Sequence, residues 1–74
     1  MLEMHPDCEK CGTDLAAFAG GAFICSFECT FCADCTDDMD ERCPNCGGEL
    51  MDRPARSKAS LVKHPASQIR KHTL

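Results

Sequence analysis

The chain has 74 residues, enough for one small domain whose apolar core alone is too small to keep it folded. It contains eight cysteines and neither Trp nor Tyr, so the composition predicts that bonds to sulfur replace much of the missing core. No apolar run approaches the roughly 18 residues of a membrane helix, and the acidic N-terminus lacks the features of a secretory signal. We therefore expect a cytoplasmic protein whose reduced thiols bind metal. In a mature secreted fragment the same cysteines would indicate disulfides.

Charge is divided unevenly along the chain. Residues 1–50 carry two basic and eleven acidic side chains, a formal charge of −9, whereas residues 51–74 carry six basic side chains against Asp52, a formal charge of +5. Pro, Ser, Ala and spaced basic residues leave the second part without clear periodicity. We predict a cysteine-rich domain at residues 1–50 and a basic tail at residues 51–74 that is flexible or ordered by a partner. A short helix over residues 67–72 is the tail's one candidate element.

The first expected element is a Cys-x2-Cys-Gly turn at Cys8, Cys11 and Gly12. Residues 8–15 and 43–50 agree at both cysteines, the glycine, an acidic residue and a leucine. Such a turn directs two sulfurs to the same side and needs a positive φ after the second, which glycine adopts readily. We therefore expect two zinc knuckles, one near each end of the cysteine-rich domain.

A hairpin is expected next, because Gly20 and Gly21 interrupt the apolar residues of 15–27. Phenylalanine and cysteine alternate over residues 23–31, so an extended chain would place rings and sulfurs on one face. The four phenylalanines would then form a small core around the metal. Residues 33–42 suit a short helix with acidic residues near its start, and Pro44 prevents its continuation.

The eight cysteines form four closely spaced pairs: Cys8/Cys11, Cys25/Cys29, Cys32/Cys35 and Cys43/Cys46. Structural Zn²⁺ takes four ligands, commonly all cysteine, so the pairs predict two zinc ions with no ligand left over. Iron, as a cluster or a mononuclear centre, is the main alternative metal. A sequential pairing would join the first two pairs and the last two. The order knuckle, hairpin and helix instead favours a cross-brace that joins the first pair with the third and the second with the fourth.

The segment from Glu28 to Cys35 reads Glu-Cys-Thr-Phe-Cys-Ala-Asp-Cys, and Cys43-Pro-Asn-Cys46 follows it. This pattern resembles the RING finger, in which a fourth ligand, usually histidine, precedes an aromatic residue and a Cys-x2-Cys, and Cys-Pro-x-Cys closes the motif. Cys29 stands where that histidine usually stands. The resemblance covers residues 8–46 and implies a cross-braced, all-cysteine variant.

Residues 24–35, from Ile24 to Cys35, and residues 43–50, Cys-Pro-Asn-Cys-Gly-Gly-Glu-Leu, also resemble a narrower group. They are similar to the short bacterial eight-cysteine proteins grouped as domain-of-unknown-function family 1272. That resemblance implies a bacterial protein and a fold rather than an activity. The expected fold is a small metal-stabilised α+β fold, RING-like and treble-clef, with two zinc knuckles, one β-hairpin and one short helix.

We expect no enzyme activity, because a metal held by four cysteines has no open position for water. Ubiquitin ligation is not expected either, since RING ligases usually have an apolar residue after the first ligand and often a basic one after the last, where this chain has Glu9 and Gly47. His5 is expected at the surface rather than on a metal.

The leading hypothesis is a protein–protein interaction adaptor with two structural zinc ions and no membrane association. The alternatives are a zinc- or redox-responsive thiolate protein and a nucleic-acid accessory protein acting through the basic tail. The charge of residues 1–50 opposes nucleic acid.

Overall fold

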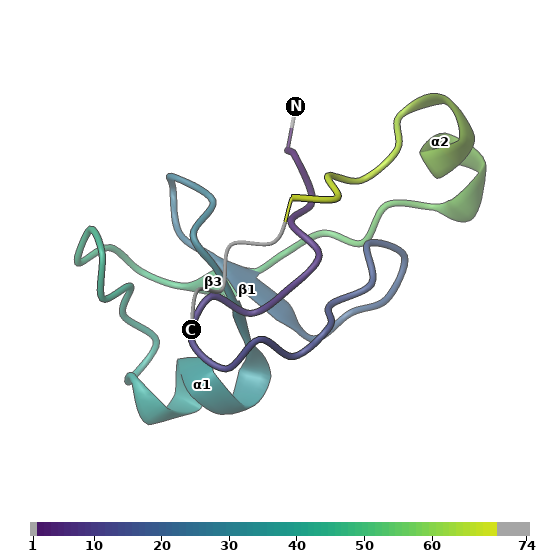
Figure 1. Ribbon diagram of the computed structural model, residues 1–74. Coiled ribbons are helices and arrows are strands. Elements are labelled where there is room, and N and C mark those ends of the chain that lie inside the picture. The colour runs from purple at the N-terminus through teal and green to yellow at the C-terminus, as the bar shows by residue number, and fades with distance from the viewer. Residues whose placement is uncertain (1, 70–74) are drawn as a thin grey trace.

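The computed structural model describes residues 2–69 and has a small α+β fold (Figure 1). Its antiparallel sheet has the strand order β2-β1-β3, formed by β1 (Ala22–Ile24), β2 (Thr30–Cys32) and β3 (Met51–Asp52). Helix α1 (Ala33–Asp38) follows β2 directly, whereas α2 (Lys58–Lys63) lies at the opposite end of the molecule, away from the sheet (Figure 1). Within residues 2–69, neither helix has the length and apolarity that crossing a bilayer requires.

The first knuckle, residues 7–14, is a compact turn closed by backbone hydrogen bonds. Gly12 N–H donates to the Cys8 carbonyl and Cys8 N–H donates to the Thr13 carbonyl, both at 2.9 Å. Gly12 has a φ of 79°, a conformation that costs little without a Cβ. Leu15 leaves the knuckle by donating to the Pro6 carbonyl at 2.8 Å.

The second knuckle, residues 42–49, repeats each of these bonds. Gly47 N–H donates to the Cys43 carbonyl and Cys43 N–H donates to the Gly48 carbonyl, both at 2.8 Å, and Gly47 has a φ of 76°. Leu50, the counterpart of Leu15, donates to the Glu41 carbonyl at 2.8 Å. The sequence repeat is therefore a repeat of backbone geometry.

The β-hairpin lies later in the chain than the glycine pair predicts. Strand β1 pairs with β2 so that Phe23 is opposite Phe31, and the connecting loop is residues 25–29. Glu28 turns this loop, with a φ of 64° and an N–H that donates to the Cys25 carbonyl at 3.0 Å. Because the chain reverses here, it does not remain extended from residue 23 to residue 31. Phe27 is 77% exposed whereas Phe31 is 2% exposed, so the predicted common face of rings and sulfurs is wrong.

Helix α1 ends four residues before the predicted end at residue 42. Asp40 and Glu41 have φ values of 53° and 59°, which no right-handed helix accommodates. Asp40 N–H donates to the Asp37 carbonyl at 3.1 Å and Glu41 N–H donates to the Thr36 carbonyl at 2.9 Å. These are the two bonds of a Schellman motif, with Asp40 in the position that usually holds glycine. The early stop turns the chain back towards the second knuckle.

Contacts with the first 50 residues continue beyond the predicted domain boundary. Strand β3 pairs with β1, which makes three strands where one hairpin was expected. Arg53 is 4% exposed, and its guanidinium donates to the carbonyls of His5 at 2.8 Å, Leu15 at 3.4 Å and Ala16 at 3.5 Å. Arg56 then donates to the Leu2 carbonyl at 2.6 Å. Residues 51–56 therefore pack as part of the cysteine-rich unit.

The tail's helix forms earlier than predicted. Ser57 caps α2, its hydroxyl accepting from Ser60 N–H at 3.2 Å. Residues 67–69 are not helical, and the remainder of the helix predicted over residues 67–72 lies outside the described residues. The described structure thus has two short helices rather than one.

Candidate metal centre

The first sulfur cluster consists of Cys8, Cys11, Cys32 and Cys35, whose Sγ atoms all lie within 4.8 Å of one another. The first knuckle supplies two of these sulfurs and the β2–α1 junction supplies the other two. The Sγ atoms of Cys11 and Cys32 are 3.7 Å apart. Four sulfurs at about 2.3 Å from a tetrahedral zinc ion are separated by about 3.8 Å. The spacing therefore fits a shared metal, whereas a disulfide would need about 2.05 Å.

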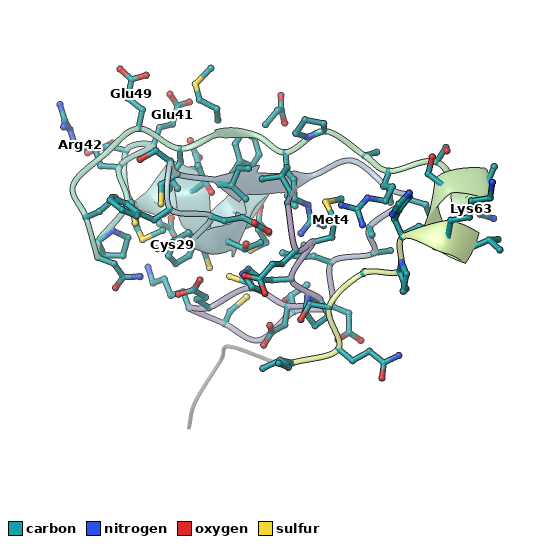
Figure 2. All side chains as sticks on the ribbon, turned by 90° about the horizontal axis from the view of Figure 1, so that it is seen from above. Met4, Cys29, Glu41, Arg42, Glu49 and Lys63 are labelled. Atoms are coloured by element: carbon teal, nitrogen blue, oxygen red, sulfur yellow. The ribbon has the colours of Figure 1, made fainter. Side chains whose placement is uncertain are left out.

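The second sulfur cluster is formed by the hairpin loop and the second knuckle. The Sγ atoms of Cys25, Cys29 and Cys43 lie within 4.8 Å of one another. The sulfur of Cys46, the predicted fourth ligand, does not lie within that distance of all three, but it interacts with the sulfurs of Cys25 and Cys43 from the exposed side. Figure 2 places Cys29 at the end of the molecule that carries Arg42 of this knuckle. All eight cysteines are free thiols, so both clusters can bind metal.

A single apolar core joins the two clusters. Phe31 and Leu50, each 2% exposed, pack in one cluster of buried residues with Cys8 and Cys35 of the first set and Cys25 and Cys43 of the second. Phe31 therefore lies between the two sites, as predicted from its position in the sequence between the pairs Cys25/Cys29 and Cys32/Cys35. Phe18 and Phe27 are 52% and 77% exposed, so the expectation that all four phenylalanines shield the metal is wrong.

Backbone N–H groups point at sulfurs of both clusters. Phe27 N–H donates to Cys25 Sγ at 3.3 Å, Cys35 N–H donates to Cys32 Sγ at 3.5 Å, and Gly48 N–H donates to Cys46 Sγ at 3.4 Å. The bond to Cys32 also caps α1, because Cys32 is the residue that precedes the helix. N–H donors of this kind favour the thiolate, the form that binds metal.

The thiols of the first cluster differ in acidity. Hydrogen bonds from the side chain and backbone of Thr13, whose hydroxyl lies 3.1 Å from the sulfur, lower the pKa of Cys11 to about 6. Burial raises the pKa of Cys32 and of Cys35, and the sulfurs of Cys8 and Cys11 add to both rises. At neutral pH one thiol of the cluster is therefore ionised readily. Ionisation of the others is unfavourable until a cation compensates their negative charge.

The second cluster follows the same pattern. Burial opposes the ionisation of Cys25, but hydrogen bonds from Phe27 N–H and from Cys29 outweigh it and lower the pKa of Cys25 to about 7. Burial raises the pKa of Cys29 to about 12. In each cluster, an acidic thiol stands beside thiols that need a cation in order to ionise.

The sets of cysteines that the structure brings together are those of the cross-brace, not those of the sequential pairing. The donors are soft sulfurs, and such donors suit zinc and mononuclear iron alike. Ligation of a metal by these eight residues remains a prediction, and the geometry establishes that two groups able to hold metal exist.

His5 is 5% exposed, so the prediction that it lies at the surface is wrong. Glu9 has a structural role that was not predicted, since its carboxylate accepts from Thr30 N–H at 3.0 Å and from Asn45 Nδ2 at 3.3 Å. The available signal was an acidic residue immediately after the first ligand, where the RING pattern has an apolar one. Glu9 thereby connects the two knuckles through β2.

Comparison with known proteins finds both a family model and a relative that match most of the chain. The model of the family described as "Protein of unknown function (DUF1272)" matches residues 1–56, which include both sulfur clusters, β3 and Arg53. An uncharacterised protein of Rhizobium meliloti (strain 1021) is 52% identical over 71 residues, covering 95% of this chain and 84% of the relative. No solved structure matches the chain.

Proposed function

We propose that this chain, which belongs to the family DUF1272, is a non-catalytic adaptor in which two structural zinc ions hold a surface that binds another protein. The observation that carries the proposal is the pair of sulfur clusters joined by one core around Phe31. Eight cysteines are used in two tetrahedral sets, which leaves no metal position open to a substrate.

The proposal includes the assignment of the fold as RING-like and treble-clef. A knuckle that meets a cysteine pair at the start of a helix is the arrangement of a treble clef, and two interleaved sulfur sets are the arrangement of a RING finger. Cys-x2-Cys-Gly turns suit zinc in preference to an iron–sulfur cluster. Both assignments agree with a reducing compartment such as the cytoplasm, where thiols persist.

The metal-dependent surface that we propose for the partner centres on Phe27. This side chain is 77% exposed at the tip of the loop 25–29, while its own N–H donates to Cys25 Sγ. A metal bound by Cys25 and Cys29 would fix the loop that displays the ring. Aromatic residues displayed in this way are enriched where proteins bind one another.

Two measurements test the zinc assignment. Native mass spectrometry should show the chain with two zinc ions, and iron, one zinc or disulfides would contradict it. Chelation should collapse the NMR dispersion of residues 8–50, since structural zinc contributes an apparent ~10–16 kcal/mol per ion in finger peptides. A well-dispersed spectrum of the reduced, metal-free chain would exclude metal-dependent folding.

A capture experiment tests the adaptor role. Zinc-loaded chain is used as bait together with two variants, Phe27→Ser and Val62→Ser. Val62 is the matched control because it is 84% exposed on α2, away from the sulfur clusters. A defined protein should be retained saturably by wild type and by Val62→Ser, and lost with Phe27→Ser and after chelation. Equal retention by both variants would reject the proposed surface.

A second candidate function is release of metal on oxidation. Cys11 and Cys46, the second cysteines of the two knuckles, are exposed, and Cys11 Sγ is 3.7 Å from Cys32 Sγ. Two thiolates and one hydrogen peroxide, with two protons, would give a disulfide and two waters, and the metal would lose two ligands. Release of one zinc per peroxide with a Cys11–Cys32 disulfide in the peptide map would support this function. Retention of zinc at a tenfold excess of peroxide would reject it.

A further inference from the structure

A third group of potential ligands lies outside both sulfur clusters. The carboxylates of Glu3 and Glu28 and the imidazole of His5 offer ligand atoms that lie within 4.8 Å of one another. His5 Nε2 is 3.9 Å from Glu3 Oε2 and 3.9 Å from Glu28 Oε2. The N-terminal segment therefore meets the hairpin loop at three polar side chains.

The imidazole of His5 is buried, and it makes no hydrogen bond with any of residues 2–69. Its side chain is 6% exposed, its Nδ1 has no partner among these residues, and both contacts of Nε2 are longer than a hydrogen bond allows. Buried polar groups are satisfied in the great majority of proteins, because leaving one unpaired is costly. Nε2, the ring nitrogen that faces both carboxylates, is therefore the atom to which an added ion could bind.

The gaps around His5 suit a cation. An ion bonded at about 2.1 Å to a nitrogen and to an oxygen separates these atoms by about 3.4 Å at the tetrahedral angle, so each 3.9 Å gap would narrow by about 0.5 Å when an ion binds. Two carboxylates supply the charge that a divalent ion needs. Glu28 is held in place, since its two oxygens accept from the N–H groups of Glu3 and Met4 at 2.9 Å each.

We propose that Glu3, His5 and Glu28 form a third, exchangeable site for a divalent transition cation such as Zn²⁺. One imidazole nitrogen and two carboxylate oxygens are the donors such ions accept, and three protein ligands leave a position for water. The open position and the 67% exposure of the Glu3 side chain make this site weaker than a four-cysteine site. Bound metal would tie residues 3–5 to Glu28, the residue that precedes Cys29.

The test uses the full-length chain without an affinity tag, first loaded with two zinc ions. Zinc chloride is then added and followed by native mass spectrometry and by the ring nitrogen NMR signals of the histidines. We expect a third zinc whose binding shifts the His5 signal before that of His64, an exposed histidine outside the cluster. Glu3→Gln should weaken the third zinc at least about tenfold. Its side chain is exposed, so the substitution leaves the fold intact.

Glu49→Gln is the matched control, because it makes the same change of charge at an exposed carboxylate of the second knuckle, where Figure 2 places Glu49. Glu49→Gln should leave the affinity for the third zinc ion unchanged. Binding of two zinc ions only would overturn the proposal. So would a third zinc that leaves the His5 signal unmoved or responds equally to Glu3→Gln and Glu49→Gln. The first two zinc ions are counted in the same spectra, so the four-cysteine assignment is judged separately.

Discussion

Glu9 and Thr30 exchange two hydrogen bonds: Glu9 N–H donates to the Thr30 carbonyl at 2.9 Å, and Thr30 N–H donates to the Glu9 carboxylate at 3.0 Å. Thr30 is fully buried at the start of β2, so its N–H has no access to water. The second oxygen of Glu9 accepts from Asn45 in the second knuckle. One acidic side chain between Cys8 and Cys11 thus helps to set how the two sulfur clusters lie relative to each other.

Glu9→Ala should therefore lower the free energy of unfolding by about 1–3 kcal/mol, the cost of leaving a buried N–H without its charged acceptor. Thermal unfolding of the zinc-loaded protein at fixed free zinc measures this change. The control is Lys10→Ala at the neighbouring exposed position, where we expect a change within about 0.5 kcal/mol. Equal effects of the two substitutions would show that the Glu9 carboxylate is dispensable.

Cys43→Ala should loosen the loop around Cys25 more than the region of Cys35, although Cys35 is much closer in sequence. Cys43 shares its sulfur cluster with Cys25 and Cys29, and losing one sulfur removes a ligand from that set alone. Native-state amide exchange, read at Glu28 and at Met39, measures the effect. Faster exchange at Met39 with protection retained at Glu28 would contradict the cross-brace.

Arg53→Met should destabilise the protein by about 1.5–3 kcal/mol, because it leaves the carbonyls of His5, Leu15 and Ala16 without their charged donor. Lys63→Met removes the same charge from the exposed end of α2 and should have little effect. Unfolding by urea at fixed free zinc compares the two. A small effect of Arg53→Met would place residues 51–56 outside the cooperative unit, in agreement with the predicted boundary at residue 50.

The parts of the structure that were predictable from sequence are those fixed by local geometry. The two knuckles follow from Cys-x2-Cys-Gly, since the positive φ at Gly12 and Gly47 is a property of the residue itself. The grouping of the sulfurs followed from the order of the elements. The small α+β class is likewise confirmed.

The errors arose where tertiary contacts decide the conformation. The turn at Glu28 has a positive φ without glycine, held by hydrogen bonds from the N-terminal segment to its carboxylate, so the Gly20-Gly21 signal placed the hairpin too early. Arg53 falls in the tail that was expected to be flexible or ordered by a partner, because its carbonyl partners are 37 to 48 residues away in sequence. His5 was placed at the surface for the same reason, since its neighbour Glu28 comes from the hairpin loop.

Metal affinity should rise with pH. Burial raises the pKa of Cys32 and Cys35, and that of Cys29 to about 12, so these thiols are protonated at pH 7 and a metal must displace their protons. Cys11, with a pKa of about 6, is already a thiolate at pH 7, so it contributes to the pH dependence of metal affinity only at lower pH. An unfolded metal-free chain gives the same sign, because an ordinary thiol titrates near about 8.5.

Each displaced proton raises the dissociation constant about tenfold per unit fall in pH, so the protons of Cys32 and Cys35 by themselves predict at least roughly a hundredfold between pH 8 and pH 7. Competition with a chelator whose own pH dependence is known measures this at the first sulfur cluster. A pH-independent affinity would mean that the thiols are ionised before the metal binds.

Asp40→Gly should stabilise the protein by about 0.5–1 kcal/mol, against the usual direction of a glycine substitution. Asp40 has a φ of 53° at the end of α1, a conformation that glycine adopts without the steric cost of a Cβ. Asp38→Gly, two residues earlier and within α1, should destabilise the protein by a similar amount. Glycine increases the conformational entropy of the unfolded chain, and at this helical position it relieves no strain in the folded one. Both variants remove one exposed carboxylate from the same acidic segment, so their charge effects cancel in the comparison.

Thermal unfolding at fixed free zinc measures both variants. The melting temperature should rise with Asp40→Gly and fall with Asp38→Gly. If both variants were destabilised equally, the Schellman turn after α1 would not form in solution. The path that brings Cys43 back to Cys25 and Cys29 would then need another origin.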